Sequence, residues 1–110
     1  MKRCFVTLKS FANDWKNIGL SEFDMVQLEN SLILNPHEGA VIKDTNGIRK
    51  LRYRLPNKGK SGGLRVFYLD IPEKGKLYLI TLISKNEKEN LSRAEINELA
   101  KLSTHLKEIA

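Results

Sequence analysis

The stretch that most constrains the fold is the longest apolar run in the chain, at positions 77–83, which reads Leu-Tyr-Leu-Ile-Thr-Leu-Ile. It is far shorter than the roughly 20 residues that a membrane-spanning helix needs. Its length, its aromatic and β-branched content and the turn signals before it are typical of a strand buried on both faces. We therefore expect residues 77–83 to form the centre of a sheet.

Two further strands are predicted directly before this run. Residues 48–55 alternate between apolar and basic side chains, which predicts a strand with one core face and one positively charged face. Residues 64–71 form the next strand, and 72–75 the turn that leads into the apolar run. The segment 56–63 contains three glycines and cannot be the interior of a strand, so we interpret it as a loop.

The rest of the chain supplies helices and an opening strand. Residues 3–8 suit a strand that leads into a short helix over 11–15, ended by Gly19. Ser21 caps a second helix, which runs to Asn35 and Pro36, and residues 36–47 are loop-like. A capping box at 92–95 starts a final helix whose apolar residues recur at helical spacing to the end of the chain.

Length and composition indicate a single globular domain over residues 1–110, since 41% of the residues are apolar and 29% are charged. The lone Cys4 can form no intramolecular disulfide, and no signal peptide is recognisable, so we predict a cytoplasmic protein. The two histidines and one cysteine show no metal-ligand spacing, and Gly59-Lys60-Ser61 is not a nucleotide-binding P-loop. The sequence therefore predicts neither a metal nor a cofactor.

The net charge of +6 is concentrated in one segment. Residues 43–76 hold ten basic residues against three acidic ones, which leaves the remainder nearly neutral. Such a distribution is typical of a protein that binds nucleic acid or another polyanion, although a merely solubilising surface has about even odds for a basic protein.

Three segments together resemble the HigB-type branch of the RelE/ParE superfamily of toxins from bacterial type II toxin-antitoxin systems. They are residues 47–52 (GIRKLR), 59–68 (GKSGGLRVFY) and 82–92 (LISKNEKENLS). The resemblance covers nearly the whole chain. It implies an α+β, RelE-like fold, in which two N-terminal helices pack on a largely antiparallel sheet of about four strands, with a C-terminal helix.

The resemblance also implies an activity, that of a ribosome-dependent messenger RNA endonuclease (mRNA interferase) that stops translation. The RNA 2′-hydroxyl would attack the adjacent phosphate without a metal, and cationic side chains would stabilise the developing charge. Matched by position, Arg65 is the candidate phosphate clamp, and Lys58 and Lys60 are candidates for base, acid or electrostatic roles. The candidates for RNA or ribosome contacts are Arg49, Lys50, Arg52, Arg54, Tyr68 and Lys85.

One position departs from the pattern of the resemblance. Many relatives carry a tyrosine just before the Lys-Asn-Glu motif, where this chain has Ile83 and Ser84. Either Tyr68 or Tyr53 takes the place of that tyrosine, or the activity is weak, or the site is used differently.

The implied partners are the ribosome, messenger RNA and a cognate antitoxin, expected to be of helix-turn-helix type and encoded next to the toxin. Operator DNA would be bound only by the toxin-antitoxin complex, and no membrane partner is expected. Two alternatives remain: a non-catalytic toxin that inhibits a protein target such as gyrase, and a passive nucleic-acid-binding module, whose affinity would fall steeply with salt.

Overall fold

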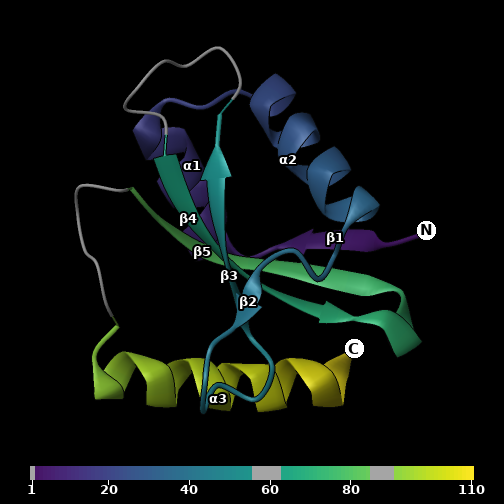
Figure 1. Ribbon diagram of the computed structural model, residues 1–110, viewed down its shortest axis with the longest axis vertical. Helices are drawn as coiled ribbons and strands as arrows, with labels where there is room; N and C mark the ends of the chain where they lie inside the picture. The colour runs from purple at the N-terminus through teal and green to yellow at the C-terminus, as the bar shows by residue number, and fades with distance from the viewer. Residues whose placement is uncertain (1, 56–62, 85–90) are drawn as a thin grey trace.

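The computed structural model describes residues 2–55, 63–84 and 91–110 of the chain (Figure 1). These residues form three α-helices, five strands and one short 3₁₀ turn. In chain order they are β1 (Cys4–Thr7), α1 (Lys9–Ile18), α2 (Glu22–Leu34), β2 (Ala40–Val41), β3 (Arg49–Arg54), β4 (Gly63–Ile71), η1 (Pro72–Lys74), β5 (Lys76–Ser84) and α3 (Arg93–Ile109).

The strands form one sheet in the order β1-β5-β4-β3-β2. The central part of the sheet is the antiparallel meander of β3, β4 and β5, and β1 pairs with β5 in parallel. The predicted largely antiparallel sheet is confirmed, with β5 between two neighbours. The predicted number of strands was one too low, because the two-residue strand β2 lies in the segment assigned to a loop.

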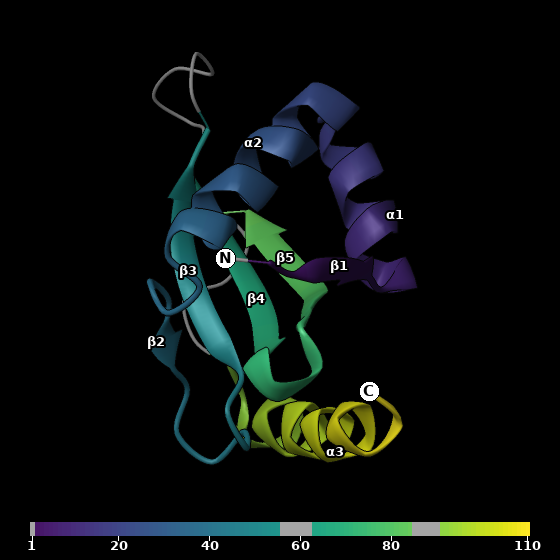
Figure 2. The ribbon, with the colours of Figure 1, turned by 90° about the vertical axis from the view of Figure 1, so that its right-hand side faces the viewer.

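Helices cover both faces of the sheet, as Figure 2 shows. α1 and α2 pack on one face, where Phe11, Trp15, Leu28 and Leu32 meet the inward side chains of β3, β4 and β5. α3 packs on the other face, where Leu106 is buried against a second cluster that includes Phe67 and Ile80. This double cover is the reason why six of the nine residues of β5 are apolar.

The helix ends follow the predicted signals. Gly19 adopts the left-handed conformation at φ 91°, which ends α1. Ser21 and Asp24 form a capping box at the start of α2, and Ser92 and Glu95 form another at the start of α3. α1 is longer than the predicted helix over 11–15, since it begins at Lys9 and continues to Ile18. Across the part of the chain that the structure describes, no helix is long and apolar enough to cross a membrane.

Candidate functional site

The basic side chains of β3 and β4 gather on the side of the sheet that faces α3. Antiparallel partners share a face, and Lys50 lies opposite Phe67, which packs in the α3 cluster. Two residues further along, Arg52 lies directly opposite Arg65. We call the side chains of Lys50, Arg52, Arg54 and Arg65 the basic face.

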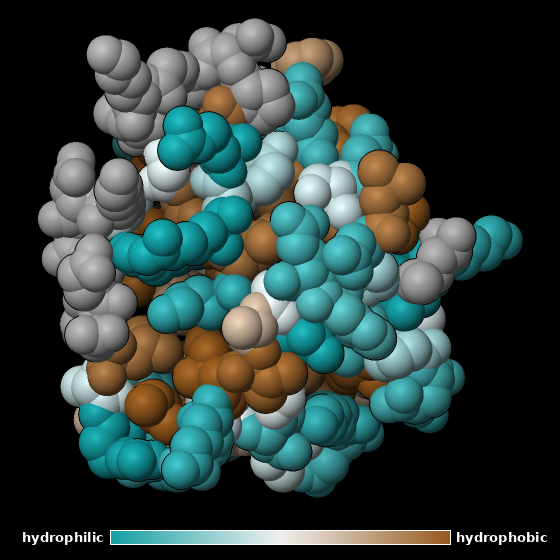
Figure 3. All heavy atoms as spheres, viewed as in Figure 1, coloured by the Kyte–Doolittle hydropathy of each residue, from teal (hydrophilic) through white to brown (hydrophobic). Residues whose placement is uncertain are grey.

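The members of the basic face differ in exposure. Arg52 and Arg54 are exposed, Lys50 is half-buried and Arg65 is only 5% exposed. α3 crosses the sheet near the turn between β4 and β5, so the opposite ends of β3 and β4 extend beyond it (Figure 1). In the space-filling view, hydrophilic side chains lie over this exposed part of β3 (Figure 3). The geometry therefore combines two accessible guanidinium groups with one that is held inside the protein.

Arg49 does not join the basic face, although the sequence grouped it with the RNA contacts. It lies opposite Tyr68 and thus on the side of the sheet that faces α1 and α2. Its Nη1 donates to the carbonyl oxygens of Gly39 at 2.7 Å and His37 at 3.3 Å. Those bonds hold the connection between α2 and β2, so Arg49 has a structural role, and its predicted contact with RNA stays a prediction.

Tyr68 is also a structural residue, which corrects its assignment as an RNA contact. The side chain is fully buried in the core. Its hydroxyl donates to the carbonyl oxygen of Pro36 at 2.7 Å and accepts from the backbone N–H of Gly39 at 3.0 Å. The pKa of Tyr68 lies above its usual range, and the largest cause is burial of the phenol. A phenol in this environment can neither stack on a base nor exchange a proton with RNA.

Tyr53 cannot take the place of the missing tyrosine either. It packs against the cluster of α1 and α2, on the face of the sheet opposite the basic face. Burial raises the pKa of Tyr53, and the nearby Asp24 adds to that effect. Ile83, which stands at the departure from the family pattern, lies opposite Arg65 on β5. Neither Tyr53 nor Tyr68 therefore lies on the face of the sheet that holds Arg65 and Ile83.

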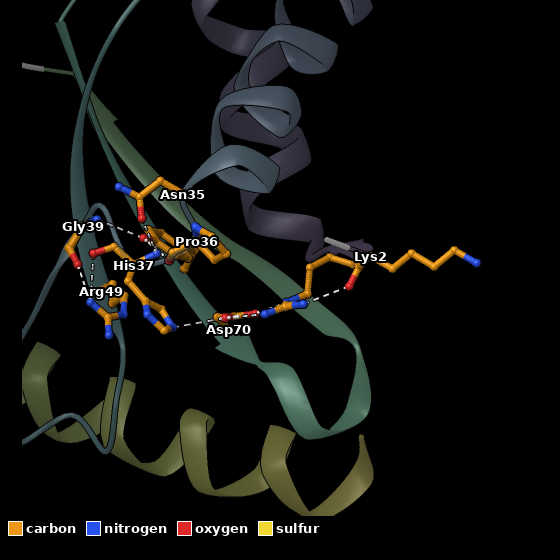
Figure 4. A network of polar contacts seen from close by, with 9 residues as sticks. Lys2, Asn35, Pro36, His37, Gly39, Arg49 and Asp70 are labelled. Carbon is orange, nitrogen blue, oxygen red and sulfur yellow. Dashed lines mark hydrogen bonds and ion pairs between the residues drawn. The ribbon is translucent and has the colours of Figure 1, made fainter.

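A polar network secures β4 near its turn into β5, at the end of the strand away from Arg65 (Figure 4). Asp70, whose side chain is 2% exposed, accepts from Arg3 Nε at 2.6 Å and from Arg3 Nη2 at 3.2 Å. Its other neighbour is His37, whose Nε2 lies 3.6 Å from Asp70 Oδ2. The pKa of Arg3 is raised, and the largest cause is its hydrogen bond to the Asp70 carboxylate. This network ties the N-terminal segment and the α2–β2 connection to β4.

An open hollow of about 750 Å³ lies between α3 and β5, beside the basic face. Phe67 and Ile83, the strand partners of Lys50 and Arg65, form part of its floor. Leu91, Ala94 and Leu99 line it from the side of α3, together with Glu95 and Glu98. Sequence reasoning did not find this hollow, because helical spacing shows which face of α3 is apolar and not how closely that face approaches the sheet.

Lys58, Lys60 and Lys85 lie outside the described residues, so their predicted roles stay predictions. Within residues 2–55, 63–84 and 91–110, no three His, Cys, Asp or Glu side chains gather closely enough to hold a metal ion.

The architecture has a counterpart among solved structures. The chain is similar to a double arginine-to-alanine mutant of the E. coli toxin RelE in the free state, with a TM-score of 0.56 and 21% sequence identity. The match covers 100% of both chains. The fold is RelE-like. No family model matches the sequence.

The RelE-like fold confirms the predicted architecture of helices on a largely antiparallel sheet with a C-terminal helix. At this level of identity the similarity establishes the fold alone, and fold by itself does not determine function. Any statement about activity therefore depends on the basic face and the hollow beside it.

Proposed function

We propose that this chain is the toxin component of a type II toxin-antitoxin system and acts as a ribosome-dependent messenger RNA endonuclease of HigB type. The main observation in support of this proposal concerns Arg52 and Arg65. They occupy directly opposed positions of β3 and β4, on one face of a RelE-like sheet. A guanidinium group presents two parallel N–H donors, which suit the bidentate recognition of a phosphate.

The proposed reaction is an internal phosphoryl transfer. The RNA 2′-oxygen forms a bond to the adjacent phosphorus while the bond from phosphorus to the 5′-oxygen breaks. A base takes the proton of the 2′-hydroxyl and an acid protonates the departing 5′-oxygen, so the products are a 2′,3′-cyclic phosphate and a free 5′-hydroxyl. Lys58 and Lys60 are our candidates for these proton transfers, with electrostatic stabilisation as the other role open to them.

Arg65 suits the role of phosphate clamp because the protein holds it in place. An arginine that is only 5% exposed has lost much of its freedom before the substrate arrives. A fixed charge in a poorly solvated position stabilises a developing negative charge more strongly than a mobile one in water. The burial of Arg65 is therefore consistent with transition-state stabilisation.

The remaining surface suits the binding of RNA. Lys50, Arg52 and Arg54 can contact successive phosphates along β3, and Lys85 is a further candidate. The largely apolar hollow beside Phe67 offers space for an unstacked base. The missing catalytic groups would come from the ribosome.

The proposed partners follow from this function: the ribosome, messenger RNA and an adjacently encoded antitoxin of helix-turn-helix type, with operator DNA bound only by the complex. The proposed location is the cytoplasm.

One observation favours a second reading, that of a non-catalytic toxin or binding module. Neither Tyr53 nor Tyr68 reaches the basic face, so no tyrosine of β3 or β4 supplies the group that many relatives carry. A surface without that group binds a polyanion as well as one that has it.

Expression in bacteria, with transcript ends mapped during growth arrest, separates the two readings. We expect arrest with cleaved messenger RNA, and we expect Arg65→Ala to reduce cleavage by about a hundredfold, the scale for loss of one stabilising charge. Arg93→Ala, which removes an exposed arginine at the start of α3, is the matched control and should keep full activity.

Circular dichroism of purified Arg65→Ala must show a folded protein for the comparison to count. Undiminished cleavage by a folded Arg65→Ala protein contradicts the assignment of that residue. Intact transcripts together with DNA damage support a toxin directed at gyrase. Intact transcripts with salt-dependent RNA binding support a passive binding module.

A further inference from the structure

The turn between β2 and β3 carries the single Asn-Gly pair of the sequence, Asn46 and Gly47. Both residues have positive φ angles, 58° for Asn46 and 101° for Gly47. The buried hydroxyl of Thr45 fixes the turn, because it donates to Ile42 O at 2.7 Å and accepts from Ile48 N at 3.2 Å. The turn therefore holds an exposed asparagine on a fixed backbone.

Asn46 is bonded to α3, which passes beside the turn (Figure 1). Its side-chain Nδ2 donates to Thr104 Oγ1 at 3.1 Å, and its Oδ1 accepts from Lys107 Nζ at 3.2 Å. Its backbone carbonyl oxygen accepts from Ser103 Oγ at 2.6 Å and from Lys107 Nζ at 2.9 Å. One residue of the turn thus connects to three side chains of the helix.

An asparagine followed by glycine is chemically labile in water. The backbone nitrogen of Gly47 can form a bond to Cγ of Asn46, because glycine has no side chain to hinder the approach. The bond from Cγ to Nδ2 then breaks, the proton of the Gly47 N–H goes to the leaving nitrogen, and ammonia departs from a succinimide ring. Water opens this ring at either of its two carbonyl carbons, which gives aspartate or isoaspartate.

The contacts with α3 oppose the first step of this reaction. The attack requires Cγ of Asn46 to turn toward the Gly47 nitrogen, and the bonds of Nδ2 and Oδ1 to α3 hold the side chain in place. The Asn46 carbonyl group and the Gly47 nitrogen belong to one planar peptide unit. The bonds of that carbonyl to Ser103 and Lys107 therefore restrict the attacking nitrogen as well.

We propose that Asn46 is a site of spontaneous deamidation whose rate is set by the docking of α3 on the turn. The docked helix protects the amide, and local opening of α3 exposes it to attack. The proposal does not depend on the proposed RNA cleavage, because it concerns the chemistry of the turn alone.

The two products differ in their effect on α3. An aspartate loses the donor to Thr104 but keeps the attraction of Lys107. An isoaspartate adds a methylene group to the main chain, which displaces the carbonyl oxygen that Ser103 and Lys107 bind. Formation of isoaspartate therefore weakens the docking that protected Asn46.

The test incubates the purified full chain at mildly alkaline pH and follows deamidation of Asn46 by mass spectrometry of proteolytic peptides. We expect Thr104→Val and Lys107→Ala each to raise the rate by about fivefold, the factor for the loss of one hydrogen bond that opposes opening. Lys101→Ala removes an exposed lysine that pairs with Glu98 on the same helix. It is the matched control and should leave the rate unchanged.

Two further measurements complete the test. In urea, where α3 is not docked, Asn46 should deamidate at least about tenfold faster than in the folded protein. In purified protein that carries isoaspartate at position 46, the backbone amides of α3 should exchange hydrogen faster than in the unmodified protein. Circular dichroism checks that the variants are folded before incubation.

Three results would overturn the proposal. If Asn46 stays intact in urea, it is not a deamidation site. If the folded protein deamidates as fast as the protein in urea, or if folded Thr104→Val and Lys107→Ala both react at the rate of the unsubstituted protein, α3 does not protect the amide. Unchanged hydrogen exchange of α3 in the isoaspartate form contradicts the link between the modification and docking.

Discussion

The identity of Gly39 is tightly constrained by its neighbours. A Cβ atom at this position would lie 2.9 Å from Tyr68 Cε1 and 3.0 Å from the carbonyl oxygen of Lys50. Real Cβ atoms almost never approach other heavy atoms that closely, and the ring of Tyr68 is fixed by burial and by its hydroxyl. The close approach of two backbone segments over Tyr68 therefore requires glycine.

We expect Gly39→Ala to lower the free energy of unfolding by about 1–3 kcal/mol, the usual cost of inserting a carbon into a packed site. Urea denaturation measures the change. Glu38→Ala, at the exposed neighbouring position, should alter stability by less than about 0.5 kcal/mol. If Gly39→Ala leaves the free energy of unfolding unchanged, the ring of Tyr68 can move aside.

Arg49 and Arg52 show how differently two arginines of one strand can be used. Both belong to β3, but Arg49 binds two backbone carbonyl groups on the side of α2, and Arg52 is exposed on the side of α3. The parity of their positions determines this difference, because successive side chains of a strand point to opposite faces.

The connection between α2 and β2 is held by side-chain hydrogen bonds from β3 and β4. It has little regular structure, and the hydroxyl of Tyr68 links its carbonyl and N–H groups at Pro36 and Gly39. Asp70 and Arg49 contact the same segment from β4 and β3 (Figure 4). Three neighbouring attachments position the strand β2 at the edge of the sheet.

Tyr68→Phe should lower the free energy of unfolding by about 1–2 kcal/mol near neutral pH, because a buried carbonyl and N–H lose their partner. It should also change the dependence of stability on pH. The pKa of Tyr68 is raised in the folded state, mainly by burial. Its contribution to stability is therefore fully present below its unfolded pKa of about 10 and is lost as pH rises through the higher folded pKa.

Urea unfolding at a series of alkaline pH values checks this expectation. The decline of stability above about pH 10 should be shallower in Tyr68→Phe than in the unsubstituted protein. Tyr53→Phe should reduce the decline as well, since burial also raises the pKa of Tyr53. Equal slopes in all three proteins would show that neither tyrosine is protected from ionisation.

For the whole molecule, the placement of helices determines where positive charge is accessible. α1 and α2 cover one face of the sheet, and α3 covers only part of the other, so the exposed residues of the basic face lie on the incompletely covered side (Figure 2). Binding of RNA to this surface should release counterions in proportion to the number of phosphates contacted.

We therefore expect affinity for single-stranded RNA to fall with salt, and Arg52→Ala and Arg54→Ala each to reduce the slope of log K against log salt by about 0.7. Fluorescence anisotropy at several salt concentrations measures the slope. Lys16→Ala, at an exposed position of α1 on the opposite face, should leave it unchanged. If Lys16→Ala reduces the slope as much as Arg52→Ala does, RNA is attracted by the net charge of the protein and not by the basic face.

The sequence by itself predicted the meander of β3, β4 and β5, the cap of α2 at Ser21, the capping box of α3 and the glycine at the end of α1, since all of these depend on neighbours within a few residues. It also predicted that Lys50, Arg52 and Arg54 share a face. It missed β2, because a two-residue strand carries no periodicity of its own and exists only through pairing with β3.

Only the tertiary structure decided which residues reach the candidate site. It buried Tyr68, directed Arg49 to backbone carbonyls and placed Arg52 opposite Arg65, and each of these depends on contacts between segments far apart in the chain. Local patterns specify which side of a strand a residue occupies. They do not specify what covers that side, because packing of distant elements decides it.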